Sequence, residues 1–181
     1  AASSRPAAEE DWEHAVASTR RMQAMIQHVI GVLREDQSGA AYEITAVELE
    51  GMVRGRVQPL ARERGVEFAS TVRTDFVLSN RVANLLALIL VNLCENGLQA
   101  TPRGKRVLLD ITRDADRLRF TVSDEGPGFP ADVPLFMPCR SAKEDGTGIG
   151  LALCKQLANH LDATLEWARS SAAGCVFHLT L

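Results

Sequence analysis

The feature that most constrains the fold is a stretch, residues 81–101, that is apolar on nearly every side. It reads RVANLLALILVNLCENGLQAT and is followed by Pro102 and Gly104, residues that end helices. A helix that is apolar all round has to be buried inside a protein. Its unbroken apolar run, residues 85–91, is shorter than the roughly 20 residues that a membrane span needs. The stretch therefore predicts a buried core helix of a globular protein.

Around this stretch, helix signals are interspersed with strand signals, and most of the strands come in pairs. Further helices are expected at 10–36, 47–64 and about 148–160, and strands at 66–70, 107–113, 118–124, 163–168 and 175–181. Gly65 is a natural stop for the second helix, residues 114–116 read as a hairpin turn, and residues 37–46 read as a linker. Paired strands with interspersed helices favour an α+β fold, a mixed sheet with helices on one face.

The N-terminal region differs in character from the rest of the chain. Residues 1–9 are small and polar and predict a disordered tail. Residues 10–36 carry a narrow apolar stripe at Val16, Met22, Met25/Ile26, Val29 and Val32/Leu33. Because such a stripe is typical of a helical bundle, we expect this helix to form a homodimer. The expected division is a tail at 1–9, a partial dimerisation helix and linker at 10–44, and a folded domain at 45–181.

Charge and cysteine content argue against several classes of protein. Lys and Arg number 20 against 23 Asp and Glu, a formal net charge of −3. Binding to a nucleic-acid backbone would need a basic field, so no nucleic-acid partner is expected. None of the cysteines forms a CxxC pair, so reduced, buried thiols are expected at Cys94, Cys139, Cys154 and Cys175. Without a signal peptide or a span, we expect a cytoplasmic domain with no membrane contact.

Three stretches carry side chains and loops suited to an anionic ligand. Asn92 and Asn96 share one face of the apolar helix, where buried carboxamides need partners such as a metal ion, a phosphate or neighbouring loops. Residues 124–128, DEGPG, follow a strand; glycines admit a ligand there, and Asp124 can accept a hydrogen bond from a ligand amino group. Residues 146–151, GTGIGL, lead into a helix N-terminus, which suits phosphate. Each stretch alone also fits a plain structural role.

In their order and spacing, these stretches resemble the catalytic ATP-binding domain of bacterial sensor histidine kinases, in the GHKL ATPase superfamily. Residues 92–96 look like the N box, 124–128 like the G1 box and 146–150 like the G2 box. Residues 135–143, LFMPCRSAK, resemble the F box more loosely. The resemblance covers about residues 45–181. It implies a two-layer α/β sandwich of the Bergerat type, with a mixed, mostly antiparallel sheet, preceded by a long N-terminal helix.

The resemblance also implies roles for individual residues. Asn96 would hold the Mg²⁺ that bridges the ATP phosphates, and Asn92 would help to position the phosphates or the metal, which makes this pair the catalytic candidates. Asp124 would accept the adenine amino group. The other ATP-binding candidates are loop residues: Gly126, Gly128, Lys143, Gly146, Thr147, Gly148, Ile149, Gly150 and Leu151.

Two positions depart from the family pattern. Gly97 stands where the family usually has alanine, which weakens a helix by about 1 kcal/mol but would allow close approach of the nucleotide. Gln99 lies where many relatives carry a basic residue that meets phosphate. Part of the phosphate contact could therefore come from Arg140 or Lys143 between the G1 and G2 boxes, although both also fit solvated charges.

The resemblance implies that the enzyme is a two-component protein-histidine kinase. It would move the γ-phosphoryl group of ATP to a histidine and then, in a phosphorelay, to the receiver domain of a response regulator. The sequence has four histidines, at His14, His28, His160 and His178. None of them fits the family's acceptor pattern H-[ED]-x-[RK]-x-P. We expect an acceptor helix before residue 1, so this chain would bind Mg-ATP without phosphorylating itself. Its parent would be either membrane-anchored or soluble.

Two alternatives stay open. One is a GHKL serine kinase of the anti-sigma type, which the long helix before residue 47 and the F-box-like stretch disfavour. The other is a degenerate nucleotide-sensing module without phosphotransfer, which intact Asn96, Asp124 and both glycine loops disfavour. A GHKL ATPase of the gyrase or mismatch-repair type would carry a general-base glutamate at position 92, where this chain has asparagine.

Overall fold

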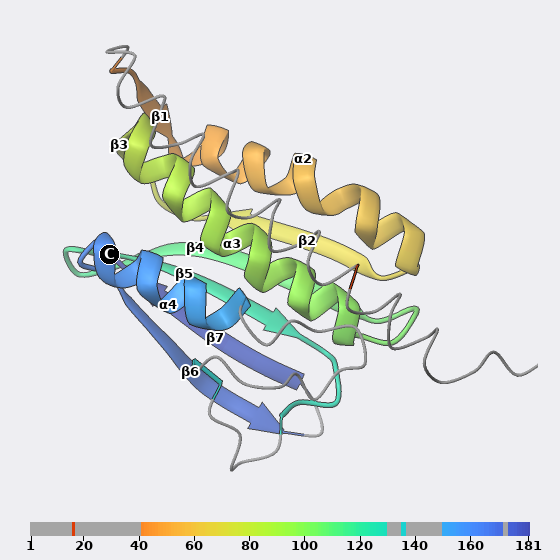
Figure 1. Ribbon diagram of the computed structural model, residues 1–181. Coiled ribbons are helices and arrows are strands. Elements are labelled where there is room, and N and C mark those ends of the chain that lie inside the picture. The colour runs from red at the N-terminus through yellow and green to blue at the C-terminus, as the bar shows by residue number, and fades with distance from the viewer. Residues whose placement is uncertain (1–15, 17–40, 130–134, 137–149, 172–173) are drawn as a thin grey trace, which may run out of the picture.

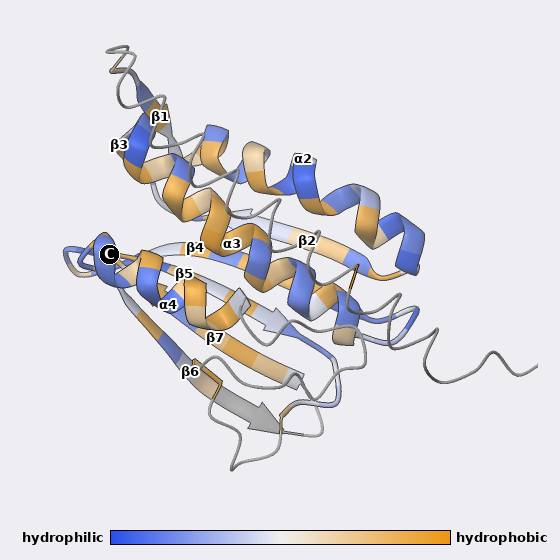
Figure 2. Ribbon diagram, in the orientation of Figure 1, coloured by the Kyte–Doolittle hydropathy of each residue, from blue (hydrophilic) through white to orange (hydrophobic). Residues whose placement is uncertain are grey.

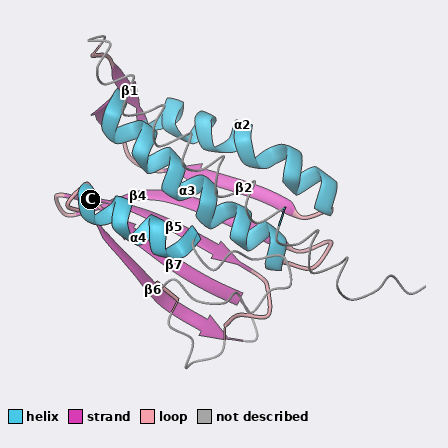
Figure 3. Ribbon diagram, in the orientation of Figure 1, coloured by secondary structure: helices cyan, strands magenta, loops and turns pink. Residues whose placement is uncertain are grey.

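A computed structural model describes residue 16 and residues 41–129, 135–136, 150–171 and 174–181. Among these residues the elements follow the order β1 (Glu43–Thr45), α2 (Ala46–Arg64), β2 (Glu67–Val72), β3 (Val77–Ser79), α3 (Asn80–Ala100), β4 (Arg106–Asp114), β5 (Arg117–Asp124), α4 (Gly150–His160), β6 (Thr164–Ser171) and β7 (Gly174–Thr180). The helices lie together over one face of the larger sheet (Figure 1), and the two layers are plain when helices and strands are coloured apart (Figure 3). The expected helix at 10–36 lies outside the described residues, apart from Val16.

The larger sheet is mixed and mostly antiparallel. Its five strands run in the order β2-β4-β5-β7-β6, and β1 pairs with β3 in a separate two-stranded sheet. Only the β2–β4 pair in the larger sheet is parallel among the described strands; β4–β5, β5–β7 and β6–β7 are antiparallel. The α+β fold with helices on one face is therefore confirmed.

Helix α3 is the core helix that the apolar stretch predicts. It packs against α2, α4, β4 and β5, and its buried residues include Leu86, Ile89 and Leu90, each with 0% exposure. By length and composition alone α3 could cross a membrane, but 67% of its 18-residue apolar window is buried inside the protein. Figure 2 shows hydrophobic residues along much of this helix, which lies between α2 and α4 over the larger sheet. The helix therefore serves as the centre of the folded core.

The strand alternation turns one set of side chains towards the helices. On β4 the buried residues are Val107, Leu109 and Ile111, and on β5 they are Leu118, Phe120 and Val122. This period of two is the signal that predicts both strands from the sequence. Ala115, with φ of 53°, lies in the turn between them, as the hairpin prediction requires.

One segment of the predicted linker is part of the fold. Residues 43–45, inside the expected linker 37–46, form β1 and pair with β3 in antiparallel register, Glu43 opposite Ser79 and Thr45 opposite Val77. A strand of three residues is too short to show an alternating pattern, and its partner lies beyond α2 and β2 in the sequence. The linker prediction is wrong for these residues because their structure depends on that distant pairing.

Helix α2 begins with a capping box. The Glu48 backbone N–H donates to Thr45 Oγ1 at 3.3 Å, and the Thr45 backbone N–H donates to Glu48 Oε2 at 2.8 Å. Hydrogen bonds from the Thr45 backbone and then from its hydroxyl lower the pKa of Glu48 below its ordinary 4.5. At the other end Gly65 adopts the left-handed conformation, with φ of 63°, so the predicted stop is confirmed.

Replacing Glu48 with glutamine should destabilise the protein in a pH-dependent way. A lowered folded-state pKa means that the carboxylate stabilises the fold above its unfolded pKa and loses that effect as pH falls through the folded value. The variant should therefore unfold at lower urea than the parent near pH 7, and the gap should close as pH drops below 4.5. Glu63→Gln, at the far end of α2, is the control. A gap that does not narrow at all as pH falls below 4.5 would contradict the capping role.

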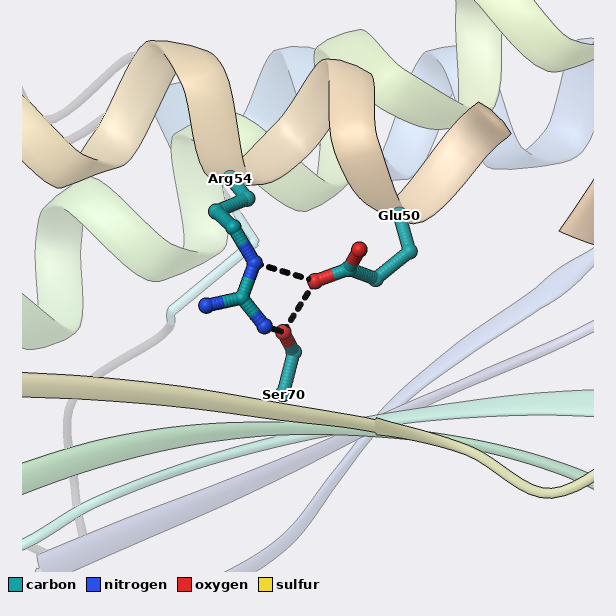
Figure 4. A network of polar contacts seen from close by, with 3 residues as sticks. All are labelled: Glu50, Arg54 and Ser70. Carbon is teal, nitrogen blue, oxygen red and sulfur yellow. Dashed lines mark hydrogen bonds and ion pairs between the residues drawn. The ribbon is translucent and has the colours of Figure 1, made fainter. Parts of the chain in front are cut away.

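A polar network joins α2 to the edge strand β2 (Figure 4). Arg54 Nε donates to Glu50 Oε1 at 2.7 Å, and Arg54 Nη2 also donates to Ser70 Oγ. The Ser70 hydroxyl donates to Glu50 Oε1. Among the described strands β2 has a neighbour on one side only, and this network adds a second attachment, which holds α2 over it.

Candidate functional site

The two asparagines of α3 lie side by side near its C-terminal end. Asn96 Nδ2 donates to Asn92 Oδ1 at 3.0 Å, so the predicted shared face is confirmed. Asn92 is 9% exposed and also receives a hydrogen bond from the Cys154 thiol of α4, with Sγ 3.5 Å from Oδ1. Burial raises the pKa of Cys154 to about 12, so its thiol keeps the proton that it donates.

Gly150, the first residue of α4, lies directly against the same carboxamide. A Cβ at this position would be 3.0 Å from Asn92 Oδ1 and 3.1 Å from Asn92 Nδ2, tighter than most real Cβ contacts. Glycine therefore lets the start of α4 approach the N-box helix. This contact brings two sequence motifs together, and half-buried Leu151 follows in the same turn. The other candidates of this stretch lie outside the described residues: Lys143, Gly146, Thr147, Gly148 and Ile149, together with Arg140.

Asp124 ends β5, and two backbone groups orient its carboxylate. Its Oδ1 accepts hydrogen bonds from the Gly126 N–H at 2.9 Å and from the Cys175 N–H at 3.3 Å. Two donors from different segments, the loop after β5 and the start of β7, fix the plane of the carboxyl group. An oriented acceptor of this kind can select a ligand by a single hydrogen bond.

Glycine is required at the two positions after Asp124, 126 and 128, for different physical reasons. At Gly126 a Cβ would be 2.9 Å from Asp124 Oδ1 and 3.1 Å from the Ala100 carbonyl oxygen, so only glycine fits between β5 and the end of α3. Gly128 has φ of 77°, which side chains disfavour. Both features shape a tight loop beside Asp124, as the DxGxG prediction expects.

Glu125, which the sequence prediction leaves without a role, anchors that loop. Its Oε2 accepts the Arg106 backbone N–H at 3.0 Å, and its own N–H donates to the Arg106 carbonyl at 3.2 Å. The loop after β5 is thereby attached to the first residue of β4. Only the tertiary pairing of β4 with β5 reveals this role.

The sequence prediction also misses Gly174 at the start of β7. Gly174 has φ of 119°, and a Cβ there would lie 1.7 Å from the Asp124 carbonyl oxygen. The next residue, Cys175, supplies one of the two N–H groups to the Asp124 carboxylate. A glycine at the start of a strand is the available signal, since it often marks close approach of another backbone.

Two further positions complete the site. Thr101, 6% exposed at the end of α3, has a hydroxyl with no hydrogen-bond partner among the described residues, next to the Ala100 carbonyl that meets Gly126. Gly97 faces the sheet, where its Cβ would be 3.2 Å from Asp124 Cβ and 3.4 Å from Val107. The structure thus gives Gly97 a packing role, and it places Asp124 beside the residue that follows Asn96.

The site therefore combines a carboxamide pair, an oriented carboxylate and a helix N-terminus at one end of α3. Among the described residues no group of three or more His, Cys, Asp or Glu side chains could hold a metal ion. A cation at this place would depend on amide oxygens and on the oxygens of a bound ligand, a pattern that suits Mg²⁺ with phosphates.

A two-layer fold with these features defines a nucleotide-binding domain of the GHKL class. The model of the family described as histidine kinase-, DNA gyrase B-, and HSP90-like ATPases matches residues 81–181, more than half of the chain. The chain belongs to this family.

Curated relatives narrow the type. The chain is 29% identical over 185 residues to the adaptive-response sensory kinase SasA of Synechococcus sp. (strain JA-2-3B'a(2-13)), covering 94% of this chain and 48% of the relative. It is 32% identical over 174 residues to the C4-dicarboxylate transport sensor protein DctS of Rhodobacter capsulatus, covering 91% of this chain and 26% of the relative. The chain thus spans about a quarter to a half of the length of these sensor proteins.

Solved structures agree with the fold. The catalytic domain of histidine kinase ThkA aligns with a TM-score of 0.68 at 21% identity, covering 78% of this chain and 95% of that domain. Full-length ShkA in complex with AMPPNP aligns with a TM-score of 0.64 at 27% identity, covering 88% of this chain and 35% of ShkA. This chain is accordingly an ATPase domain of the sensor histidine kinase type, and ATP is the nucleotide its family implies.

Proposed function

We propose that this domain binds Mg-ATP and delivers the γ-phosphoryl group to a histidine of a two-component sensor kinase, from which it passes to an aspartate of a response-regulator receiver domain. The observation that supports this most strongly is the meeting of Asn92, Asn96 and Asp124 with the start of α4 at one end of the core helix. These elements offer separate contacts to the adenine and to the phosphates.

Asp124 supports a preference for adenine. Its carboxylate, oriented by the Gly126 and Cys175 N–H groups, accepts a hydrogen bond from the exocyclic amino group of adenine. Guanine presents a carbonyl oxygen at the corresponding position, which a carboxylate repels. Gly126 and Gly128 give the loop its tight shape, which would let it pack on the nucleotide beside this contact.

The carboxamides and the α4 N-terminus would serve the phosphates. Asn96 would hold Mg²⁺ through its Oδ1, with Asn92 keeping that amide in place, and Mg²⁺ when bound supplies neutralisation of the phosphate charge. Gly150 and Leu151 begin α4, whose N-terminal N–H groups attract anions. We assign the same phosphate-binding role to Lys143, Gly146, Thr147, Gly148 and Ile149.

The residue types favour transfer to an external nucleophile over hydrolysis. A carboxamide at position 92 cannot take a proton from water as a general base at neutral pH. His160 lies at the end of α4 with Nε2 3.3 Å from Arg81 Nη2, and His178 lies on β7 with Nδ1 3.0 Å from Thr121 Oγ1. Both contacts are those of structural side chains, and we expect none of the histidines of this chain to accept the phosphoryl group.

The oligomeric state, the partner protein and the cellular location are also proposals. We infer a homodimer through the helix expected at 10–36, a response regulator as partner, and a cytoplasmic place for this domain without contacts to nucleic acid or membrane. A serine kinase of the anti-sigma type and a nucleotide-sensing module are the competing functions. Detecting phosphohistidine, phosphoserine or no transfer at all on supplied acceptors distinguishes the three.

Replacing Asn96 with alanine tests the proposal directly. The domain should bind ATP more tightly with Mg²⁺ than with EDTA, and Asn96→Ala should abolish that difference because the amide oxygen is lost. Transfer of labelled γ-phosphate to an added dimerisation-helix histidine should fall by about 100-fold or more. Calorimetry and acid-labile phosphate are the two measurements.

The control for this experiment is Asn159→Ala, an exposed asparagine near the end of α4, which should leave both readouts unchanged. Transfer that survives Asn96→Ala would overturn the assignment of Asn96. Acid-labile phosphate on this chain alone would show that one of its own histidines is the acceptor.

A further inference from the structure

Two pairs of residues face each other where α3 meets α4. Asn92 and Asn96 are one turn apart on α3, and Gly150 and Cys154 are one turn apart on α4. Cys154 is 1% exposed, with Sγ 3.5 Å from Asn92 Oδ1 and 3.9 Å from the Ile89 carbonyl oxygen. Its nearer acceptor is thus the side chain that also receives the Asn96 amide.

We propose that Cys154 is a positioning residue that acts through Asn92 to set which atom of Asn96 faces the cation. The inference rests on the proposed function, because it concerns the binding of Mg-ATP at the same site. It assigns a role to a residue that lies outside the N, G1 and F boxes and four residues beyond the last glycine of the G2 box.

The direction of the hydrogen bonds carries the inference. The Cys154 S–H and the Asn96 Nδ2–H both point at one atom, Asn92 Oδ1. A carboxamide holds its oxygen and nitrogen on opposite branches, so turning Nδ2 of Asn96 towards Asn92 turns its Oδ1 away from Asn92. The oxygen branch is the one that Mg²⁺ can use, since Mg²⁺ takes oxygen ligands.

The reversed orientation of the two carboxamides would weaken cation binding at the site. If the Asn92 carboxamide flipped, its Nδ2 would face Asn96, and Asn96 would have to turn its Oδ1 inward to accept. That oxygen would then accept a hydrogen bond from Asn92 and would no longer face the cation. The Cys154 thiol disfavours the flip, because it would lose Asn92 Oδ1, the nearer of its two acceptors.

Gly150 adds a second restraint on the same amide. Its backbone lies against the Asn92 carboxamide so closely that a Cβ would be 3.0 Å from Oδ1 and 3.1 Å from Nδ2. Asn92 is therefore held by α4 at two points one turn apart. The position of α4 is in this way coupled to the orientation of the N-box amides.

The test compares Cys154→Val, which removes the donor at similar volume, with Cys154→Ser, which keeps a donor. The readout is the ratio of ATP dissociation constants in EDTA and in Mg²⁺. Cys154→Val should reduce this ratio about three- to fivefold, the equivalent of one ordinary hydrogen bond, whereas Cys154→Ser should retain it within about twofold. Cys94→Val, at a buried cysteine on α3, is the matched control and should leave the ratio unchanged.

A second readout needs no nucleotide. In ¹H–¹⁵N spectra of the free domain, the side-chain amide signals of Asn92 and Asn96 should move and broaden in Cys154→Val and remain parent-like in Cys154→Ser and Cys94→Val. An unchanged ratio and unchanged amide signals in Cys154→Val would overturn the inference, as would equal losses in the valine and serine variants. If the parent domain binds no ATP, the proposed function fails, and the amide signals still report whether Cys154 orients the asparagines.

Discussion

Replacing Gly174 with alanine should destabilise the domain strongly and remove ATP binding. The alanine Cβ would lie 1.7 Å from the Asp124 carbonyl oxygen, and φ of 119° is a conformation that side chains rarely adopt. Both the backbone strain and the forced separation of β7 from the end of β5 act against folding. We expect the free energy of unfolding to fall by about 3–5 kcal/mol, measured by urea titration.

The matched control is another glycine-to-alanine change in the same chain. Gly55 lies exposed on α2, and a Cβ there would meet nothing within 4 Å. Gly55→Ala should raise the free energy of unfolding by about 0.5–1 kcal/mol, because alanine favours the helix. Equal stabilities of the Gly174→Ala variant and the parent would show that β7 does not approach Asp124 as described.

Changing Asp124 to asparagine should weaken ATP binding by about 100-fold with little effect on stability. The asparagine oxygen can still accept from the Gly126 and Cys175 N–H groups, so the loop keeps its shape. The other branch becomes an NH₂ group, which loses the acceptor for the adenine amino group and repels it. Calorimetric titration with ATP and thermal unfolding measure the two effects separately.

Nucleotide selectivity sharpens the same experiment. The new NH₂ group can donate to the carbonyl oxygen of guanine, so the preference for ATP over GTP should narrow in Asp124→Asn. Asp114→Asn, on the β4–β5 hairpin where Asp114 pairs with Arg119 at 2.9 Å, is the control and should bind ATP as the parent does. Undiminished ATP affinity in Asp124→Asn would show that the adenine of ATP does not bind at Asp124.

Much of the local structure could be predicted from the residues themselves. Helix α3 and strands β4 and β5 follow from apolar patterns that extend over many residues, so the predicted and observed bounds differ by about one residue. The stop at Gly65 follows from a single-residue preference, which the observed φ of 63° confirms. The β1 strand could not be predicted, because its three residues are held by pairing with β3 rather than by a local pattern.

The site divides in the same way. Asn92, Asn96 and Asp124 could be chosen from spacing and from the family resemblance, since those residue types already carry the chemistry. Gly174, Glu125 and Cys154 could not, because each acts through an atom far away in the sequence: the Asp124 carbonyl, the Arg106 backbone and the Asn92 amide.

By itself, then, the sequence determined the core helix, the chemical character of the three motifs and the class of ligand that they suit. The tertiary structure alone decided the strand order β2-β4-β5-β7-β6, which brings β7 alongside the end of β5, and the docking of α4 on α3. The physical reason is that side-chain periodicity and turn preferences are local properties of a chain. The orientation of the Asp124 carboxylate and the Asn92 amide depends on hydrogen bonds between segments that only the folded chain brings together.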